Sequence, residues 1–282
     1  MFNGIELMEF FKNISFFLEI VFFIFISKWV LDFVTSYSLK EEFTDKDNLA
    51  VSLSSSGYFI GVAIICLGAS LGDSSSYFMG LIDIATYGSL GLFLLFISKI
   101  INDNFILRKF SIKKELIEDK NSGTGAVLFG TYICSALIIA GAIVGEGGGP
   151  LSAIIFFLLG QAFMVIFTLI YQIITPFDLH QELEKDNVAA GVAFGGTFIA
   201  IGIILLKGLS EDFTSWRENL VLFLIYGFSS LILLVIVRYI FVKFFVFKVD
   251  LNREIAEDKN IGIAFLEATT AIIIATILYF II

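Results

Sequence analysis

Histidine and cysteine are scarce in this sequence of 282 residues, and their scarcity excludes whole classes of site. His180 is the only histidine, which argues against a histidine-based metal centre and against most histidine-dependent acid–base chemistry. The two cysteines, Cys66 and Cys134, both fall inside long apolar segments. A structural disulfide is not expected there, and two thiols in apolar surroundings are poor metal ligands. We therefore expect no metal and no cofactor.

Proline is rare in the sequence, and the common catalytic motifs are absent from it. Only Pro150 and Pro176 occur, both near the ends of apolar segments, so broken helices of the transporter type are not signalled. The chain contains no Walker A motif, no G-x-G-x-x-G, no H-E-x-x-H and no G-x-S-x-G. Because the side chains and motifs that usually carry catalysis are missing, the protein is not expected to be an enzyme.

Charged residues are few as well, whereas apolar residues are abundant. Only 16% of the residues are charged and 58% are hydrophobic, and the mean hydropathy is +0.94. A soluble domain of this length does not need so much apolar material, so the composition is that of a membrane protein. Since a spanning helix needs about 20 apolar residues, the sequence predicts spans at 14–37, 48–71, 78–101, 122–145, 150–175, 188–209, 217–242 and 260–282.

One acidic junction recurs four times along the chain, at 42–50, 115–123, 181–189 and 254–262. Each copy, which we call an Asn box, contains an asparagine two residues before its end and leads into a Gly- and Ala-rich segment; the asparagines are Asn48, Asn121, Asn187 and Asn260. The residues before the asparagine read Lys-Asp in the first and third boxes and Asp-Lys in the second and fourth. The chain is therefore built from four copies of a two-helix unit, and the larger four-helix unit occurs twice in tandem.

The repeats predict the topology. Each copy contributes two spans, so successive copies enter the membrane in the same direction and all four Asn boxes lie on one membrane face. The expected fold is an all-α membrane protein of eight transmembrane helices from four parallel two-helix repeats. Residues 1–146 form the first four-helix unit and residues 147–282 the second. The natural arrangement is a pseudo-fourfold or twofold bundle around an axis along the membrane normal.

Basic residues are concentrated on the side of the Asn boxes. The opposite side holds only Lys12, Lys207 and Arg217. The positive-inside rule therefore places the boxes in the cytoplasm and both termini outside. Trp216 begins the seventh span at the outer interface, where an aromatic anchor is expected.

The Asn boxes are the most regular polar feature, and two interpretations stay open. Asparagine caps helix N-termini, and acidic residues in a first turn favour the helix dipole, so capping alone explains the boxes. Alternatively, the boxes form a ring of amides and carboxylates at a cytoplasmic mouth that attracts cations. The acids of that ring would be Asp47, Asp119, Asp186 and Asp258.

A stripe of small residues follows each Asn box. Two and nine positions after the asparagine stand Ala50 and Gly57, Gly123 and Gly130, Ala189 and Gly196, and Gly262 and Thr269. Residues seven apart share a helix face, and small residues let helices approach closely in lipid. Helix packing is the ordinary interpretation, and the lining of a pore or slot is the alternative.

Three carboxylates fall at membrane depth, and for one of them, Asp83 near the outer end of the third span, contact with water is an adequate explanation. Glu267 lies seven residues after Asn260, about 10 Å along the helix. The other three copies have no acid at this position. Glu19 falls within the first predicted span. Because a carboxylate inside a membrane is costly, Glu267 and Glu19 are each a candidate transport or polar site, although a hydrogen-bonded structural carboxyl explains each as well.

The repeated D-N-x-A and D-K-N-x-G boxes, each opening a Gly- and Ala-rich helix, resemble those of the YjfL-type family of bacterial inner-membrane proteins. The likeness covers nearly the whole chain as two tandem four-helix units. It implies a bacterial inner membrane, and the family supplies no catalytic residues to carry over.

Two functional hypotheses follow from the sequence. The first is a channel or transporter for a small solute or cation, with the boxes as its mouth and Glu267 inside. The second is a membrane scaffold or envelope-stress component that docks a cytoplasmic protein on the boxes and on the basic connector 108–120. The expected partners are the lipid bilayer and, in the second case, that protein, but no nucleic acid. An oligomer is compatible with both.

Overall fold

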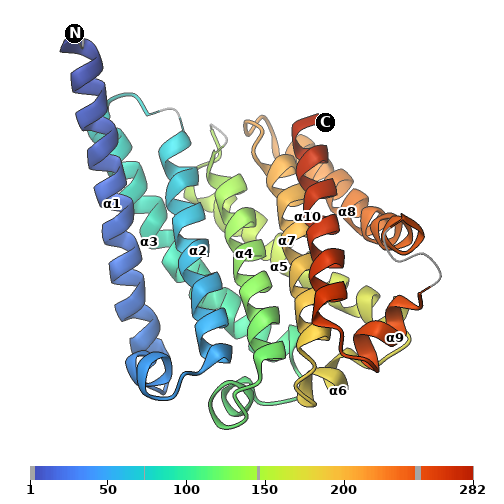
Figure 1. Ribbon diagram of the computed structural model, residues 1–282. Helices are drawn as coiled ribbons and strands as arrows, with labels where there is room; N and C mark the ends of the chain where they lie inside the picture. The colour runs from blue at the N-terminus through green and yellow to red at the C-terminus, as the bar shows by residue number, and fades with distance from the viewer. Residues whose placement is uncertain (1–3, 73, 145–146, 245–248, 282) are drawn as a thin grey trace.

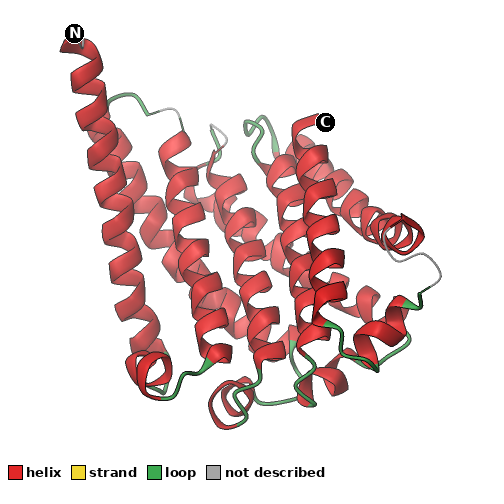
Figure 2. Ribbon diagram, viewed as in Figure 1, coloured by secondary structure: helices red, strands yellow, loops and turns green. Residues whose placement is uncertain are grey.

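The protein is a bundle of long helices, seen in a computed structural model that describes residues 4–72, 74–144, 147–244 and 249–281 (Figure 1). Within those ranges all regular structure is helical (Figure 2). The predicted spans correspond to α1 (Gly4–Val34), α2 (Leu49–Leu71), α3 (Tyr77–Ile101), α4 (Ser122–Val144), α5 (Gly149–Ile174), α7 (Val188–Leu209), α8 (Trp216–Phe244) and α10 (Ile261–Ile281). Each contains a stretch apolar and long enough to cross a membrane, which confirms eight candidate transmembrane helices in the described part of the chain.

Short helical pieces occupy the connectors at one end of the molecule. They are the π-helical turns η1 (Glu41–Asp45), η2 (Asn102–Ile106) and η3 (Lys114–Glu118) and the short helices α6 (Leu179–Glu184) and α9 (Leu251–Ala256). Four of these pieces lead directly into an Asn box. The boxes gather at the lower end in Figure 1, whereas both chain ends lie at the upper end. All four boxes therefore lie at the same end of the bundle.

The helices that follow the boxes stand side by side in chain order. Along this row α2 contacts α4, α4 contacts α7 and α7 contacts α10 (Figure 1). A second layer packs against the row: α3 and α5 both contact α4, and α8 contacts both α7 and α10. The expected bundle around a central axis is therefore wrong. Each of the inner helices α4 and α7 contacts its two neighbours through different faces. The helices therefore extend in one direction as a row, with α2 and α10 at its opposite ends.

Backbone-to-backbone contact holds the row together. A Cβ atom added to Gly130 of α4 would lie 2.1 Å from the Gly195 carbonyl oxygen of α7. A Cβ on Gly57 of α2 would lie 2.5 Å from the Phe129 Cα of α4. Since lipid supplies no hydrophobic force between helices, close van der Waals packing of this kind drives their association. The packing interpretation of the small-residue stripe is confirmed for the first three copies, whereas Gly262 and Thr269 of the fourth copy are exposed.

The middle of the row is the most enclosed part of the protein. Helices α4 and α7 are mostly buried, whereas α1, α3 and α8 expose large apolar side chains along much of their length. An exposed apolar surface of this size is expected of helices that face lipid. The predicted boundary between the two four-helix units, at residue 146, lies outside the described residues.

Candidate functional site

Each box asparagine caps the helix that follows it. The side-chain oxygen Oδ1 accepts a hydrogen bond from the backbone amide three residues later, which satisfies one of the free donors of the first helical turn. The pairs are Asn48 with Val51 at 3.2 Å, Asn121 with Thr124 at 2.9 Å, Asn187 with Ala190 at 3.1 Å and Asn260 with Ile263 at 3.2 Å. The capping interpretation is confirmed for all four boxes.

The side-chain amide of the same asparagine holds a glutamate from the preceding connector. In each case the side-chain Nδ2 of the asparagine donates a hydrogen bond to the glutamate carboxylate. The pairs are Asn48 with Glu42 at 2.7 Å, Asn121 with Glu115 at 2.7 Å, Asn187 with Glu182 at 3.0 Å and Asn260 with Glu254 at 2.8 Å. We call each asparagine–glutamate pair an Asn clasp. The first three glutamates are buried, with relative exposures of 0%, 3% and 9%.

Sequence reasoning missed these glutamates as site residues. It selected instead the aspartates that stand one or two positions before the asparagine. The signal was present, since a glutamate recurs five or six positions before every box asparagine.

Three of the four clasps also bind the next repeat. Asn48 Nδ2 donates to the Leu116 carbonyl at 2.7 Å, and Asn187 Nδ2 donates to the Ile255 carbonyl at 2.8 Å. Between them, Asn121 Nδ2 donates to the Leu183 carbonyl. These asparagines are 1% exposed or less. The fourth, Asn260, is exposed, and no carbonyl of another repeat accepts from its side chain among the described residues.

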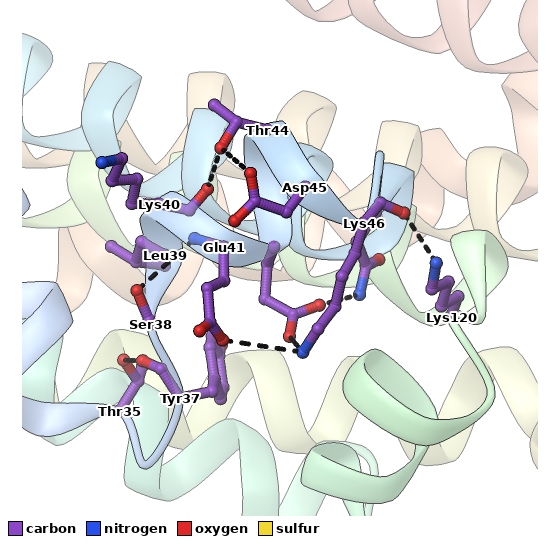
Figure 3. A network of polar contacts seen from close by, with 12 residues as sticks. Thr35, Tyr37, Ser38, Leu39, Lys40, Glu41, Thr44, Asp45, Lys46 and Lys120 are labelled. Carbon is purple, nitrogen blue, oxygen red and sulfur yellow. Dashed lines mark hydrogen bonds and ion pairs between the residues drawn. The ribbon is translucent and has the colours of Figure 1, made fainter.

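The alternating Lys-Asp order of the boxes has a structural reason. In the first and third boxes the lysine binds the clasp glutamate of its own repeat, Lys46 to Glu42 at 2.7 Å and Lys185 to Glu182 at 2.8 Å. In the second and fourth boxes the lysine reaches back to the preceding repeat. Its Nζ donates to a box carbonyl there, from Lys120 to Lys46 at 2.6 Å (Figure 3) and from Lys259 to Lys185 at 2.9 Å.

The residue just before each box asparagine adopts a left-handed backbone. The φ angles are 47° for Asp47, 50° for Lys120, 52° for Asp186 and 48° for Lys259. Aspartate adopts this conformation more readily than most residues, whereas a lysine there is uncommon. The two lysines are those that bind the preceding repeat, so a tertiary contact accompanies the less favourable backbone.

The lysines separate the clasp glutamates into two electrostatic kinds. Burial opposes the charged form of Glu42 and Glu182, but hydrogen bonds from Lys46 and Asn48 and from Lys185 and Asn187 hold the pKa of each carboxyl below its ordinary value. Glu115 has no lysine in its clasp. Burial therefore raises the pKa of the Glu115 carboxyl, against the hydrogen bond from Asn121.

The aspartates proposed as a ring do not come together at one mouth. Asp47, Asp119, Asp186 and Asp258 are all exposed and lie on successive repeats along the row. Asp186 accepts from the Gly123 amide at 3.3 Å, so it joins the second repeat to the third. Asp119 pairs with Lys114 of its own connector at 3.3 Å, and Asp258 lies 3.9 Å from Arg253.

The two candidate carboxylates at membrane depth lie far apart in the fold. Glu267 is on α10 and is 5% exposed, whereas Glu19 is half-buried on α1, beyond the other end of the row. A cavity of about 210 Å³ lies between α7, α8 and α10, toward the end opposite the boxes, and its lining includes Lys207, Tyr226 and Ser229. Two larger hollows, at Lys12 and Tyr77 and at Glu211 and Arg217, are near the end opposite the boxes. None of the three is lined by a box residue or by Glu267.

The geometry of the boxes is that of a joint between repeats. In the first three clasps the asparagine side-chain amide donates to the glutamate of the same clasp, and these glutamates are buried. Within the described ranges, no group of three or more His, Cys, Asp or Glu side chains is arranged to hold a metal ion.

Comparison with known proteins places the chain in a family. The model of the family described as Domain of Unknown Function (DUF350) matches it twice, over residues 6–143 and 147–282. The chain is also 28% identical over 261 residues to a UPF0719 transmembrane protein of Aquifex aeolicus (strain VF5), a match that covers 90% of this chain and 94% of that protein. No solved structure matches it. The chain belongs to the DUF350 family, a family of uncharacterised membrane proteins.

Proposed function

We propose that this member of the DUF350 family is a non-enzymatic membrane scaffold that docks an acidic cytoplasmic protein on the basic connector 108–120. One observation carries the proposal. The clasp glutamates are buried against Asn and Lys side chains, and the row of helices behind them is in backbone contact. A face whose acids are engaged internally and whose helices are tightly packed suits a rigid platform.

The connector 108–120 carries a cluster of accessible positive charges on that face. It contains five cations against three acids, and all five cations are exposed: Arg108, Lys109, Lys113, Lys114 and Lys120. Three of them are used within the protein: Lys109 pairs with Asp178 at 2.7 Å, Lys114 pairs with Asp119 at 3.3 Å and Lys120 binds the first box. Arg108 and Lys113 extend from the same surface. Complementary charge of this kind recruits and orients an acidic partner.

The proposal includes the location. The bias of basic residues toward the boxes supports a cytoplasmic box face with both termini outside. A relative from a bacterium, and the likeness to YjfL-type proteins, support the bacterial inner membrane.

Charge reversal tests the scaffold. We expect the purified wild-type protein in nanodiscs to retain an acidic cytoplasmic protein whose binding weakens with added salt. Arg108→Glu with Lys113→Glu should abolish that retention. Lys40→Glu with Arg253→Glu reverses the same number of exposed cations on other connectors and should preserve it. Equal retention by both double variants would contradict the proposal, and binding of anionic vesicles alone would assign the surface to lipid headgroups.

A second candidate function, transport of a small cation, rests on α7, α8 and α10. Buried Glu267 lies in the box-side half of α10, and the cavity beside Lys207, Tyr226 and Ser229 lies between the same three helices toward the other end. Polar groups at two depths of one three-helix seam are what a solute pathway requires.

Flux measurements separate the two candidates. Transport predicts cation uptake into proteoliposomes that Glu267→Gln removes and that Arg108→Glu with Lys113→Glu leaves unchanged. The scaffold predicts no flux above empty liposomes and a loss of partner binding only in the connector variant. Asp83→Asn, which exchanges an acid near the start of α3 for its amide, is the matched control for Glu267→Gln.

A further inference from the structure

The two ends of the helix row carry the same faces that join its members. At every internal contact, the residue nine positions after one box asparagine meets the residue eight positions after the next. Gly57 meets Phe129, Gly130 meets Gly195 and Gly196 meets Ala268. We call the first the leading face of a helix and the second its trailing face.

The leading face of α10 has no neighbour in the part of the chain that the structure describes. Gly262 and Thr269, two and nine positions after Asn260, are exposed, and so is Ile273 further along. A Cβ on Gly262 would meet only the Asn260 side chain, at 3.4 Å, whereas a Cβ on the equivalent Gly123 would lie 2.8 Å from the Asn187 carbonyl oxygen. The chain therefore ends on a surface shaped for close helix packing.

The trailing face of α2 is open at the other end of the row. Ser56, eight positions after Asn48, is exposed, and Leu67 on the same face is 51% exposed. Phe43 is only half-buried, although the connector residues at its position in the later repeats, Leu116, Leu183 and Ile255, are 3% exposed or less. In those repeats the clasp of the preceding repeat binds the carbonyl group of that residue, whereas no clasp among the described residues binds the Phe43 carbonyl.

We propose that a second copy of this chain supplies that clasp, with the leading face of α10 in one copy packed on the trailing face of α2 in the other. Both copies have the same orientation in the membrane, because the repeats on either side of the contact are parallel. Asn260 then donates its side-chain amide to the Phe43 carbonyl of the other copy, as Asn48 donates to Leu116.

The alternation of the boxes matches this contact. Inside the chain, the second repeat, with Gly123, meets the third, whose Asp186 accepts from the Gly123 amide. Between copies, the fourth repeat offers Gly262 in place of Gly123, and the first offers Asp47 in place of Asp186. The proposed contact is therefore of the same type as the one that already joins the two halves of the chain.

The contact is heterologous, so every copy retains one leading and one trailing face. Such contacts close into a ring when the rotation between copies permits it and extend into an open strip otherwise. Thr269 and Ser56 sit at the centre of the contact and are small, which makes them suitable positions for a disulfide between copies.

Cross-linking in native membranes tests the proposal. Two forms of the chain, both with Cys66→Ala and Cys134→Ala, carry different tags, one with Thr269→Cys and the other with Ser56→Cys. We expect oxidation to give a covalent dimer that contains both tags. A dimer formed between two Thr269→Cys copies would overturn the proposal, and so would a mixed yield no higher than that of the control pair Phe78→Cys and Leu151→Cys on lipid-facing α3 and α5.

A bulky substitution provides the second test. Gly262→Leu has space within one chain but fills the leading face, so it should abolish the mixed cross-link while the monomer stays folded. Ala85→Leu, an equal enlargement on an exposed position of α3, should leave the cross-link unchanged. Cross-linking that survives Gly262→Leu would place the contact elsewhere.

Discussion

The side-chain amide of Asn48 donates a 2.7 Å hydrogen bond to the backbone carbonyl of Leu116, which belongs to the connector of the next repeat. The same amide group donates to Glu42, and the side-chain oxygen caps α2. One side chain thus caps a helix, donates a hydrogen bond to a buried carboxylate and binds the neighbouring repeat. The Asn boxes are joints between repeats. The contribution of each joint to stability, and the differences between the joints, can be measured.

The position of a clasp in the row should decide how much its asparagine contributes to stability. Asn121→Ala removes a helix cap, worth about 1 kcal/mol, and the donor to buried Glu115 and to Leu183, worth about 1–3 kcal/mol more. Asn260→Ala should cost about 1 kcal/mol, since that clasp is exposed and binds no further repeat in the chain. Unfolding of monomeric protein in mixed micelles measures both, and equal costs would contradict the role of the clasp as a joint.

The clasp glutamates should respond to pH in opposite directions. Burial raises the pKa of Glu115 above its ordinary 4.5, so the folded chain binds more protons than the unfolded chain, and this contribution to stability is lost as pH rises through that window. Lys46 and Asn48 lower the pKa of Glu42, so its contribution is present above the ordinary value of 4.5 and is lost as pH falls below it.

The matched pair Glu115→Gln and Glu42→Gln makes this testable, because glutamine keeps an oxygen that accepts from the asparagine. At neutral pH we expect Glu115→Gln to raise the melting temperature and Glu42→Gln to lower it. Melting curves over a pH series should show the pH dependence of each site disappear in its own variant. Changes of the same sign in both variants would refute the electrostatic assignment.

Backbone contact between α4 and α7 should make one glycine intolerant of any side chain. Gly130→Ala places a Cβ only 2.1 Å from the Gly195 carbonyl oxygen. Because that oxygen belongs to the backbone, it cannot move aside without shifting α7. The free energy of unfolding should fall by about 3 kcal/mol or more, at or above the usual range for overpacking. Gly262→Ala, on the open face of α10, should change it by less than about 1 kcal/mol. Similar losses at both positions would mean that α4 and α7 are not in contact there.

Much of the fold was predictable because its causes are local. Span length and composition predicted the eight helices, and the recurring Asn48-type junction predicted four parallel units with their boxes on one face. Capping followed from the identity of the asparagine. The small residues around Gly130 predicted close packing.

The arrangement in a row was not predictable in the same way. Parallel repeats are compatible with a ring or a row, and only the directions of the leading and trailing faces decide between them. The second role of Asn48 also escaped prediction, because its acceptor is a backbone carbonyl, which any residue at position 116 would supply. Glu42 and its counterparts were overlooked because acids are frequent in these connectors, and burial, not identity, distinguishes them.

The distance between α2 and α10 within one chain tests the row most directly. Spin labels on Ser56→Cys and Thr269→Cys, in copies diluted with an excess of unlabelled protein, report that distance by pulsed electron paramagnetic resonance. The row separates the two helices by three helix spacings of about 8–10 Å each, so we predict about 25–30 Å between their axes. A distance matching one spacing, about 10 Å, would mean that α2 and α10 are neighbours in a closed bundle and would contradict the row.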